Sequence, residues 1–208
     1  MRPQAPFVFI VDDDPRVSEA LCNLLESNGH RTAAFGSAAA FLEFEKPDCP
    51  SCLILDLELP DIHGLDVQQH LSGIDGPPII FVTGHGDVPS SVRAMKSGAV
   101  EFLLKPVGRR ELLEAVTQAL ERDRAAREAR LTLGELRKRY DLLTPREREV
   151  LPFVVSGFAN KQAAAELGNS EATVAIQRGQ IMRKMAARSL AELIGMADKL
   201  GIARKGLP

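Results

Sequence analysis

The sequence predicts an α/β domain built on a doubly wound parallel sheet, followed by a helical linker and a small all-α domain. Two observations carry this prediction. Within the first 120 of the 208 residues, short apolar segments alternate with helix-like patterns, as expected for a parallel sheet covered by helices on both faces. The last 60 to 70 residues instead contain short helices with clear caps, and they are rich in basic side chains.

Five segments predict the five strands of the sheet. Most are continuous apolar runs, which is typical of strands that are buried on both faces. They are Phe7–Val11, Arg31–Phe35, Leu53–Asp56, Pro78–Thr83 and Val100–Leu104. Helical patterns follow each of them, and Gly29 and Gly98 are placed to end two of these helices. The expected helices are Pro15–Asn28, Ala38–Glu45, a segment around Val67–Leu71, Val88–Ser97 and one that begins near Arg109.

Polar side chains follow four of the predicted strands. Asp12 and Asp13 come after the first, Asp56 ends the third, Thr83 ends the fourth and Lys105 follows the fifth. Because the carboxyl ends of parallel strands meet at one edge of a sheet, we expect these side chains to lie together. An acidic residue at a strand end often only caps the next helix. That simpler explanation accounts for any single member but not for the whole set in this order.

The chemistry of this set suits a phosphoryl group. Three carboxylates in one crevice repel one another, and Mg²⁺ prefers one or two carboxylates together with water and phosphate oxygens. A hydroxyl at Thr83 and a positive charge at Lys105 would stabilise a bound or developing phosphoryl group. Asp56 is then the expected nucleophile, because a carboxylate can form an acyl phosphate.

This set, with Pro106 after Lys105, resembles the receiver domain of two-component response regulators, which has a flavodoxin-like (CheY-like) fold. The resemblance covers about residues 7–120. It implies that Phe102 is the switch aromatic that rearranges with Thr83 on phosphorylation. It also implies a cis peptide bond between Lys105 and Pro106.

The resemblance assigns roles to the acidic residues as well. It implies that Asp56 is phosphorylated by a sensor histidine kinase. Asp13, Asp56 and the backbone carbonyl of Glu58 would bind Mg²⁺, with Asp12 supporting them. Haloacid-dehalogenase-type phosphatases also use an aspartate after a strand, but they require Asp-x-Asp-x-Thr, which the sequence after Asp56 lacks. The sequence therefore predicts a switch and not an enzyme.

The charge distribution also divides the chain in two. Residues 1–121 carry a net charge of −9 and residues 122–208 a net charge of +7, which together give the −2 of the whole chain. An acidic half joined to a basic half indicates a metal- or phosphate-handling module tied to a nucleic-acid-binding one. The first residues contain no long apolar run of the kind found in signal peptides or membrane spans. We therefore expect the protein in the cytoplasm.

The predicted domains are 1–120 and 141–208, joined by a helical linker at 121–140. Apolar residues in and after this linker follow 3-4-3-4 spacing, which is the pattern of a coiled-coil seam. The stripe is shorter than a sustained coiled coil, so two interpretations stand. It forms a dimer seam, or it packs on one of the chain's own domains; dimerisation through this helix or through the receiver is a hypothesis. The stripe comprises Ala126, Ala129, Leu133, Leu136, Tyr140 and Leu143.

The second domain is predicted to hold four helices, with capping boxes at Thr144–Glu147 and Ser189–Glu192. A tight turn at Gly168-Asn169 between the second and third helices indicates a helix-turn-helix unit whose third helix enters the major groove. This region resembles the LuxR/NarL/FixJ-type DNA-binding domain. The matching motifs are Leu143–Leu151, Asn160–Ala164, Thr173-Val174 and Ile181–Met185. The whole chain thus resembles a response regulator of the FixJ/NarL family, of the FixJ-like branch, that binds double-stranded promoter DNA.

The predicted recognition helix departs from the family pattern. Members often carry Lys at the position of Ala175 and His at that of Gln177, and Gly179 interrupts a helix. Few side chains here can make bidentate base contacts. We expect selectivity from apolar contact of Ile176 and Ala175 with thymine methyl groups, or from DNA shape. An alternative function is a phosphorelay or protein-interaction module whose DNA recognition has degenerated. Contacts to the DNA backbone are expected from Lys161, Thr173, Arg178, Arg183 and Lys184.

Overall fold

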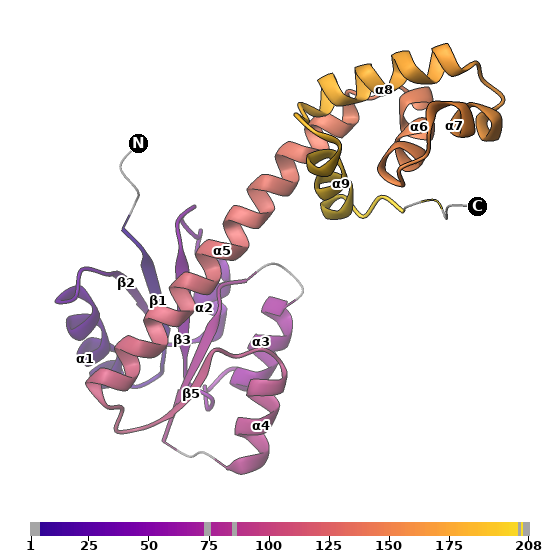
Figure 1. Cartoon of the computed structure of the whole chain (residues 1–208). Coiled ribbons are helices and arrows are strands. Elements are labelled where there is room, and N and C mark those ends of the chain that lie inside the picture. The colour runs from indigo at the N-terminus through magenta and orange to yellow at the C-terminus, as the bar shows by residue number, and fades with distance from the viewer. Residues whose placement is uncertain (1–4, 73–75, 85–86, 204, 206–208) are drawn as a thin grey trace. The chain divides into compact units, whose positions relative to one another are not determined.

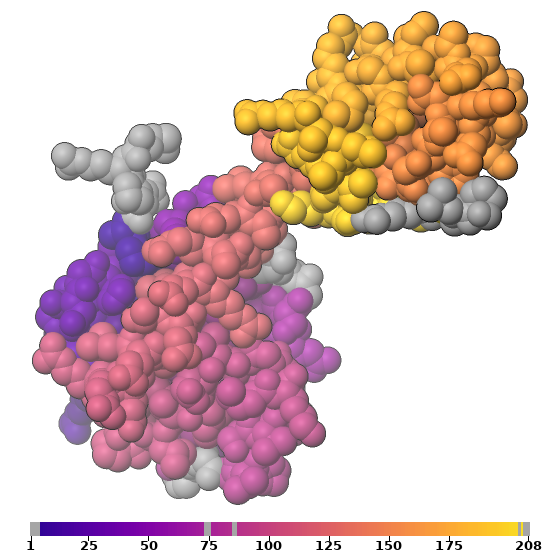
Figure 2. All heavy atoms as spheres, in the orientation of Figure 1, coloured from indigo at the N-terminus to yellow at the C-terminus, as the bar shows by residue number. Residues whose placement is uncertain are grey.

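The computed structural model describes residues 5–72, 76–84, 87–203 and 205. The chain forms two compact units, Met1–Arg127 and Glu128–Pro208. Figure 1 shows the elements of both units and Figure 2 their heavy atoms. In the part of the chain that is described, no helix has both the length and the hydropathy needed to cross a membrane.

The first unit contains the predicted five-stranded parallel sheet. Its spatial order is β2-β1-β3-β4-β5. The chain therefore places β2 on one side of β1 and then adds β3, β4 and β5 on the other side, as in a doubly wound sheet. All neighbouring strands are parallel. The doubly wound α/β fold predicted from the sequence is therefore confirmed. The strands are β1 (Phe7–Val11), β2 (Arg31–Phe35), β3 (Ser51–Leu55), β4 (Ile79–Thr83) and β5 (Glu101–Leu104).

Helices cover both faces of this sheet. Alternate strand residues point to opposite faces, so β1, β3 and β4 contribute to two separate cores. On one face, Phe9 and Phe81 pack with Phe41 of α2 and Val67 of α3; on the other, Ile10 packs with residues of α1 and α5. The helices of this unit are α1 (Pro15–Glu26), α2 (Ala38–Glu43), α3 (Gly64–Ser72), α4 (Val88–Lys96) and the first part of α5 (Arg109–Asp141).

The 33-residue helix α5 contains the whole of the expected linker. The division between the units falls inside it, after Arg127. Leu136 and Leu143, in the last part of the apolar stripe, are buried in the core of the second unit, and Tyr140 packs against the same core. Ala126 and Ala129, at the start of the stripe, are exposed. This arrangement matches the second interpretation of the stripe, in which it packs on one of the chain's own domains.

The second unit is all-α, as predicted. Its core joins the end of α5 to all four following helices. Thr144 and Glu147 form the expected capping box at α6, while Ser170 and Ser189 cap α8 and α9. Gly168 ends α7 with a φ of 63°, a left-handed conformation that glycine adopts without strain. The four helices are α6 (Pro145–Val155), α7 (Asn160–Leu167), α8 (Glu171–Met185) and α9 (Leu190–Lys199).

Candidate phosphorylation site and nucleic-acid interface

The three predicted carboxylates meet at one edge of the sheet. Val11 and Leu55 are register partners in β1 and β3, so Asp12 and Asp56 leave neighbouring strands side by side. Each of Asp12, Asp13 and Asp56 offers a carboxylate oxygen, and these oxygens all lie within 4.8 Å of one another. Asp12 and Asp56 are buried, whereas Asp13 is exposed. The cluster is thus open to solvent on the side of Asp13.

Lys105 neutralises part of this negative charge. Its Nζ lies 2.6 Å from Oδ2 of Asp12 and 2.6 Å from Oδ2 of Asp56. Burial by itself lowers the pKa of Lys105, but the hydrogen bonds and charges of the two aspartates outweigh it, and the pKa is raised above its usual value. The ammonium therefore stays charged between the two carboxylates. The peptide bond between Lys105 and Pro106 is cis, as the resemblance implied.

Backbone hydrogen bonds hold the acidic side chains in place. The Asp56 N–H donates to the Val11 carbonyl at 2.8 Å, which extends the pairing of β1 and β3 by one residue. Oδ1 of Asp56 accepts a hydrogen bond from the Glu58 N–H at 3.2 Å, and Oδ1 of Asp12 accepts one from the Asp14 N–H at 3.0 Å. Both carboxylates are therefore fixed by the loops that follow them.

Two residues that the sequence did not indicate help to shape the loop after Asp56. A Cβ at Gly64 would lie 2.7 Å from the Asp56 carbonyl oxygen, so only glycine fits this close approach. Asp61 accepts hydrogen bonds from the N–H groups of Ala38 and Ala39, at 3.3 and 3.0 Å, and thereby ties the loop to the start of α2. No local pattern in the sequence indicates that Asp61 meets Ala39, which lies 22 residues earlier.

Thr83 and Phe102, the two predicted switch residues, lie on neighbouring strands. Thr83 is buried at the end of β4, with Leu104 of β5 as its register partner. Phe102 is half-buried, and its ring centroid lies 6.1 Å from that of Phe81. The Lys105 N–H donates to the Thr83 carbonyl at 2.8 Å, which links this pair of strands to the acidic cluster.

In the second unit, α8 presents one exposed face. Val174, Ile181 and Met185 point into the core, at a spacing that places them on one side of the helix. The opposite side carries exposed residues at i, i+3, i+4, i+7 and i+11: Ala172, Ala175, Ile176, Gly179 and Arg183. Thr173 is exposed beside them in the first turn.

The basic residues predicted to contact DNA have different surroundings. Lys161 on α7 and Arg183 on α8 are exposed. Arg178 is half-buried, and its Nη1 donates to Oδ1 of Asn160 at 3.5 Å. Lys184 lies differently from the prediction. Its Nζ is 2.6 Å from Oε2 of Glu147, which is buried, and only 24% of the Lys184 side chain is exposed. Lys184 therefore pairs with a buried carboxylate inside the domain and is not part of the proposed DNA interface.

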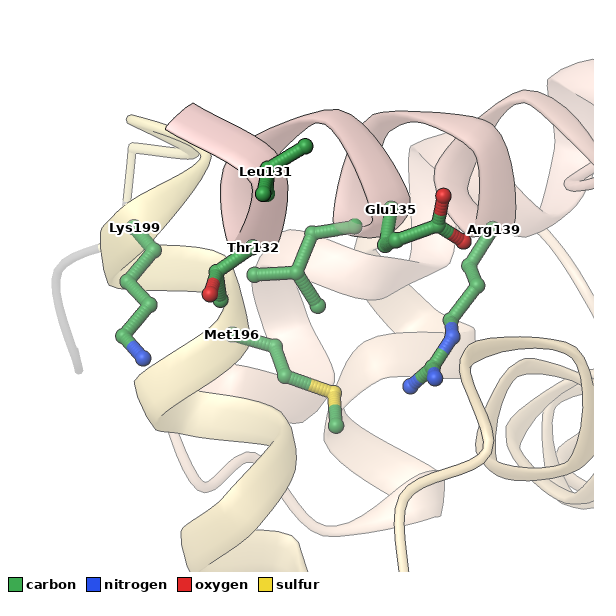
Figure 3. Close-up of a pocket in the computed structure, with 7 residues that line it drawn as sticks. Leu131, Thr132, Glu135, Arg139, Met196 and Lys199 are labelled. Carbon is green, nitrogen blue, oxygen red and sulfur yellow. The ribbon is translucent and has the colours of Figure 1, made fainter. Parts of the chain in front are cut away.

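A separate hollow of about 430 Å³ lies between the end of α5 and α9. Figure 3 shows side chains of the two helices facing each other across it. Two of its charged side chains have partners: Glu135 pairs with Lys138 at 2.7 Å, and Arg139 donates to the Met185 carbonyl at 3.4 Å. The hollow is a depression between α5 and α9, and none of its lining residues belongs to the exposed face of α8. Its lining is Leu131, Thr132, Glu135, Leu136, Arg139, Met196 and Lys199.

Both units match known families. A family described as "Response regulator receiver domain" matches residues 8–117, and one described as "Bacterial regulatory proteins, luxR family" matches residues 141–197. Nodulation protein W of Bradyrhizobium diazoefficiens is 52% identical, covering 94% of this chain and 87% of that protein. Transcriptional regulatory protein FixJ of Azorhizobium caulinodans is 41% identical, covering 97% and 96%. The solved structure of response regulator StyR is 44% identical, with a TM-score of 0.81, over 94% of this chain and 99% of that one.

Proposed function

Because the chain belongs to the response regulators that join a receiver domain to a LuxR-type DNA-binding domain, we propose that phosphorylation of Asp56 controls DNA binding by its second domain. The observation that carries this proposal is the position of Asp56. Its carboxylate is buried in a cluster of three and lies 2.6 Å from the ammonium of Lys105. A carboxylate held in this way is poised to accept a phosphoryl group.

The phosphoryl donor would be a phosphohistidine of a sensor histidine kinase. An Asp56 oxygen attacks phosphorus, the P–N bond breaks, and its electron pair stays on the imidazole nitrogen of the donor. Lys105 would then neutralise a phosphoryl oxygen instead of Oδ2 of Asp56, and the Thr83 hydroxyl would donate to another. The reaction needs little more from the protein than positioning and charge stabilisation.

The acidic residues suit Mg²⁺ as the accompanying ion. Three carboxylate oxygens within 4.8 Å of one another form a hard, all-oxygen donor set, which magnesium prefers to nitrogen or sulfur. Asp13, Asp56 and the Glu58 carbonyl would hold the ion, with Asp12 supporting them. Bound there, Mg²⁺ would offset the negative charge that the phosphoryl oxygens bring to the site. The exposure of Asp13 leaves a side of the cluster open for water and phosphate oxygens.

For DNA binding we propose that α8 enters the major groove, with contacts to phosphates from Lys161, Thr173, Arg178 and Arg183. Three of these side chains are cations, and they lie on α7 and α8, the two helices of the helix-turn-helix. Phosphorylation would act by shifting the population of receiver states. Because the proposed target is DNA, we place this activity in the cytoplasm.

We also propose that the phosphorylated chain forms a homodimer through the receiver. Helix α4 packs beside the edge strand β5. Four large apolar side chains on these two elements are exposed, which favours association there over the α5 stripe. Light scattering of the protein treated with a phosphodonor should give the mass of a dimer for wild type and of a monomer for Val92→Glu. The four are Val88, Val92, Met95 and Leu104.

The phosphorylation proposal is tested with full-length protein, Mg²⁺ and radiolabelled acetyl phosphate. Wild type should take up label, and Asp56→Asn should take up none. Asp66→Asn is the control, because Asp66 is an exposed carboxylate on the next helix. Label retained by Asp56→Asn would refute the assignment of Asp56. Footprinting on genomic fragments then tests DNA control: protection unaffected by the phosphodonor would refute it.

A further inference from the structure

The exposed face of α8 offers apolar and small groups where a base-reading helix usually offers hydrogen-bonding ones. Its first three turns present the methyl groups of Ala172 and Ala175, the side chain of Ile176 and the bare backbone of Gly179. A guanidinium appears only at Arg183, near the end of the helix. The residues of this face before Arg183 therefore offer no side-chain donor for guanine and no amide group for adenine. The nearest amide, that of Gln180, lies beside the face and accepts a hydrogen bond from Arg183.

We infer that Ile176 reads sequence by contact with the C5-methyl group of thymine. This inference rests on the proposed DNA binding and specifies how one base is recognised. In the major groove, the thymine methyl is the feature that an apolar side chain can distinguish from the edges of the other bases. Ile176 is the largest apolar group on the face, and 66% of its surface is exposed.

Gly179 lies one turn after Ile176 on the same side and favours this contact. A Cβ built at Gly179 would meet nothing within 4 Å, so the glycine leaves open space at the surface of the domain. Glycine inside a helix costs about 1 kcal/mol relative to alanine. The bare backbone lets the helix approach the base edges closely. The Ile176 side chain, which is shorter than that of arginine or lysine, can then contact the methyl group.

Basic side chains lie near the apolar face and favour DNA as its partner. Lys161 is exposed on α7 and Arg183 is exposed at the end of the face, while the half-buried Arg178 lies nearer the core side of α8, beside Asn160 of α7. These cations attract the phosphate backbone, whereas a protein partner for the face would need acidic groups to match them. The charge pattern therefore favours a nucleic-acid duplex as the occupant of this face.

Replacing thymine with uracil removes only the methyl group and tests the inference directly. A duplex is selected from a randomised library by full-length protein treated with phosphodonor, and each thymine is then replaced singly by deoxyuridine. One methyl group is worth about 0.8 kcal/mol when buried, which corresponds to about a fourfold change in Kd. We expect this loss at one position of each half-site for wild type, and less than about a twofold loss there for Ile176→Ala.

Leu142→Ala is the matched control, because Leu142 is an equally exposed apolar residue of the same unit outside α8. It should keep the full sensitivity to uracil. If wild type binds the selected duplex with no uracil-sensitive position, or if Ile176→Ala keeps the sensitivity, the inference is refuted and DNA binding stands. A selection from the randomised library that enriches no sequence also refutes the inference. Failure to bind any DNA, over a range of salt concentrations, refutes the proposed function itself.

Discussion

Replacing Lys184 with methionine should destabilise the second unit, because it leaves the Glu147 carboxylate buried without its cation. Removing one partner of a fully buried ion pair costs about 3–5 kcal/mol. Lys184 keeps 24% of its side chain exposed and Glu147 only 7%. Water therefore replaces part of the lost interaction, while methionine preserves the packing of the aliphatic stem. We expect a loss of about 2 kcal/mol in the free energy of unfolding.

The Lys184–Glu147 pair should also make the stability of the second unit depend on pH in the acid range. Burial by itself raises the pKa of Glu147, but hydrogen bonds from Lys184 and Thr144 outweigh it and hold the pKa below its ordinary value of 4.5. A carboxylate with a lowered folded-state pKa stabilises the fold above its unfolded-state pKa. That contribution is lost as the pH falls through the lower, folded-state value. In Lys184→Met, this loss of stability below about pH 4.5 should be smaller.

Tyr140 provides a selective probe for these measurements. It is the single tyrosine of a chain without tryptophan, and it packs against the core of the second unit. Its fluorescence during urea unfolding should show the transition of that unit, with a midpoint lowered by about 1–2 M for an m-value of about 1–2 kcal/mol/M.

The matched control is Lys138→Met, which breaks the Lys138–Glu135 pair. The distance is also short, at 2.7 Å, but the two side chains are 76% and 62% exposed. A surface pair of this kind contributes little to stability, because water and salt screen it. Equal midpoints for Lys184→Met and Lys138→Met would show that burial of Glu147 does not determine the effect and would refute the reasoning.

Three further predictions address the receiver and the DNA interface. Gly64→Ala should slow phosphorylation by acetyl phosphate and lower the urea midpoint of the receiver, because the added Cβ meets the Asp56 carbonyl oxygen at 2.7 Å. Asp123→Asn should cost the receiver about 2–3 kcal/mol in circular-dichroism unfolding, because the buried carboxylate accepts from the Ser51 N–H and pairs with an arginine. Lys161→Ala should reduce the slope of log K against log salt by about 1, and an unchanged slope would remove Lys161 from the interface.

The parallel sheet and its polar edge could be predicted because their signals are local. Each buried strand is a short apolar segment, and a residue such as Asp56 is visible in the sequence as the polar end of that segment. Parallel topology then brings these ends together without further information. The FixJ-like family assignment made from the same motifs is confirmed by the family matches and by the relatives.

Long-range partners could not be predicted in the same way. Lys184 carries a charge on a helix of a DNA-binding domain, which favours an interface role when the sequence alone is considered. Its partner Glu147 lies 37 residues earlier, and nothing in the spacing of the two indicates that they meet. The bond from the Ser51 N–H to Asp123, 72 residues away, is equally invisible. Such contacts depend on how helices pack, which a local pattern does not specify.

The apolar stripe of α5 shows the same limit and bears on the dimer proposal. Regular spacing establishes that a helix has an apolar side, but not what covers it. Leu136 and Leu143 are buried in the second unit, so a coiled-coil seam would have to remove them from that core. Ala126 and Ala129 would be left exposed for the seam, and an alanine methyl group contributes only about 0.8 kcal/mol on burial. A dimer formed on phosphorylation therefore has more apolar surface to bury on α4 and β5 than on the apolar stripe of α5.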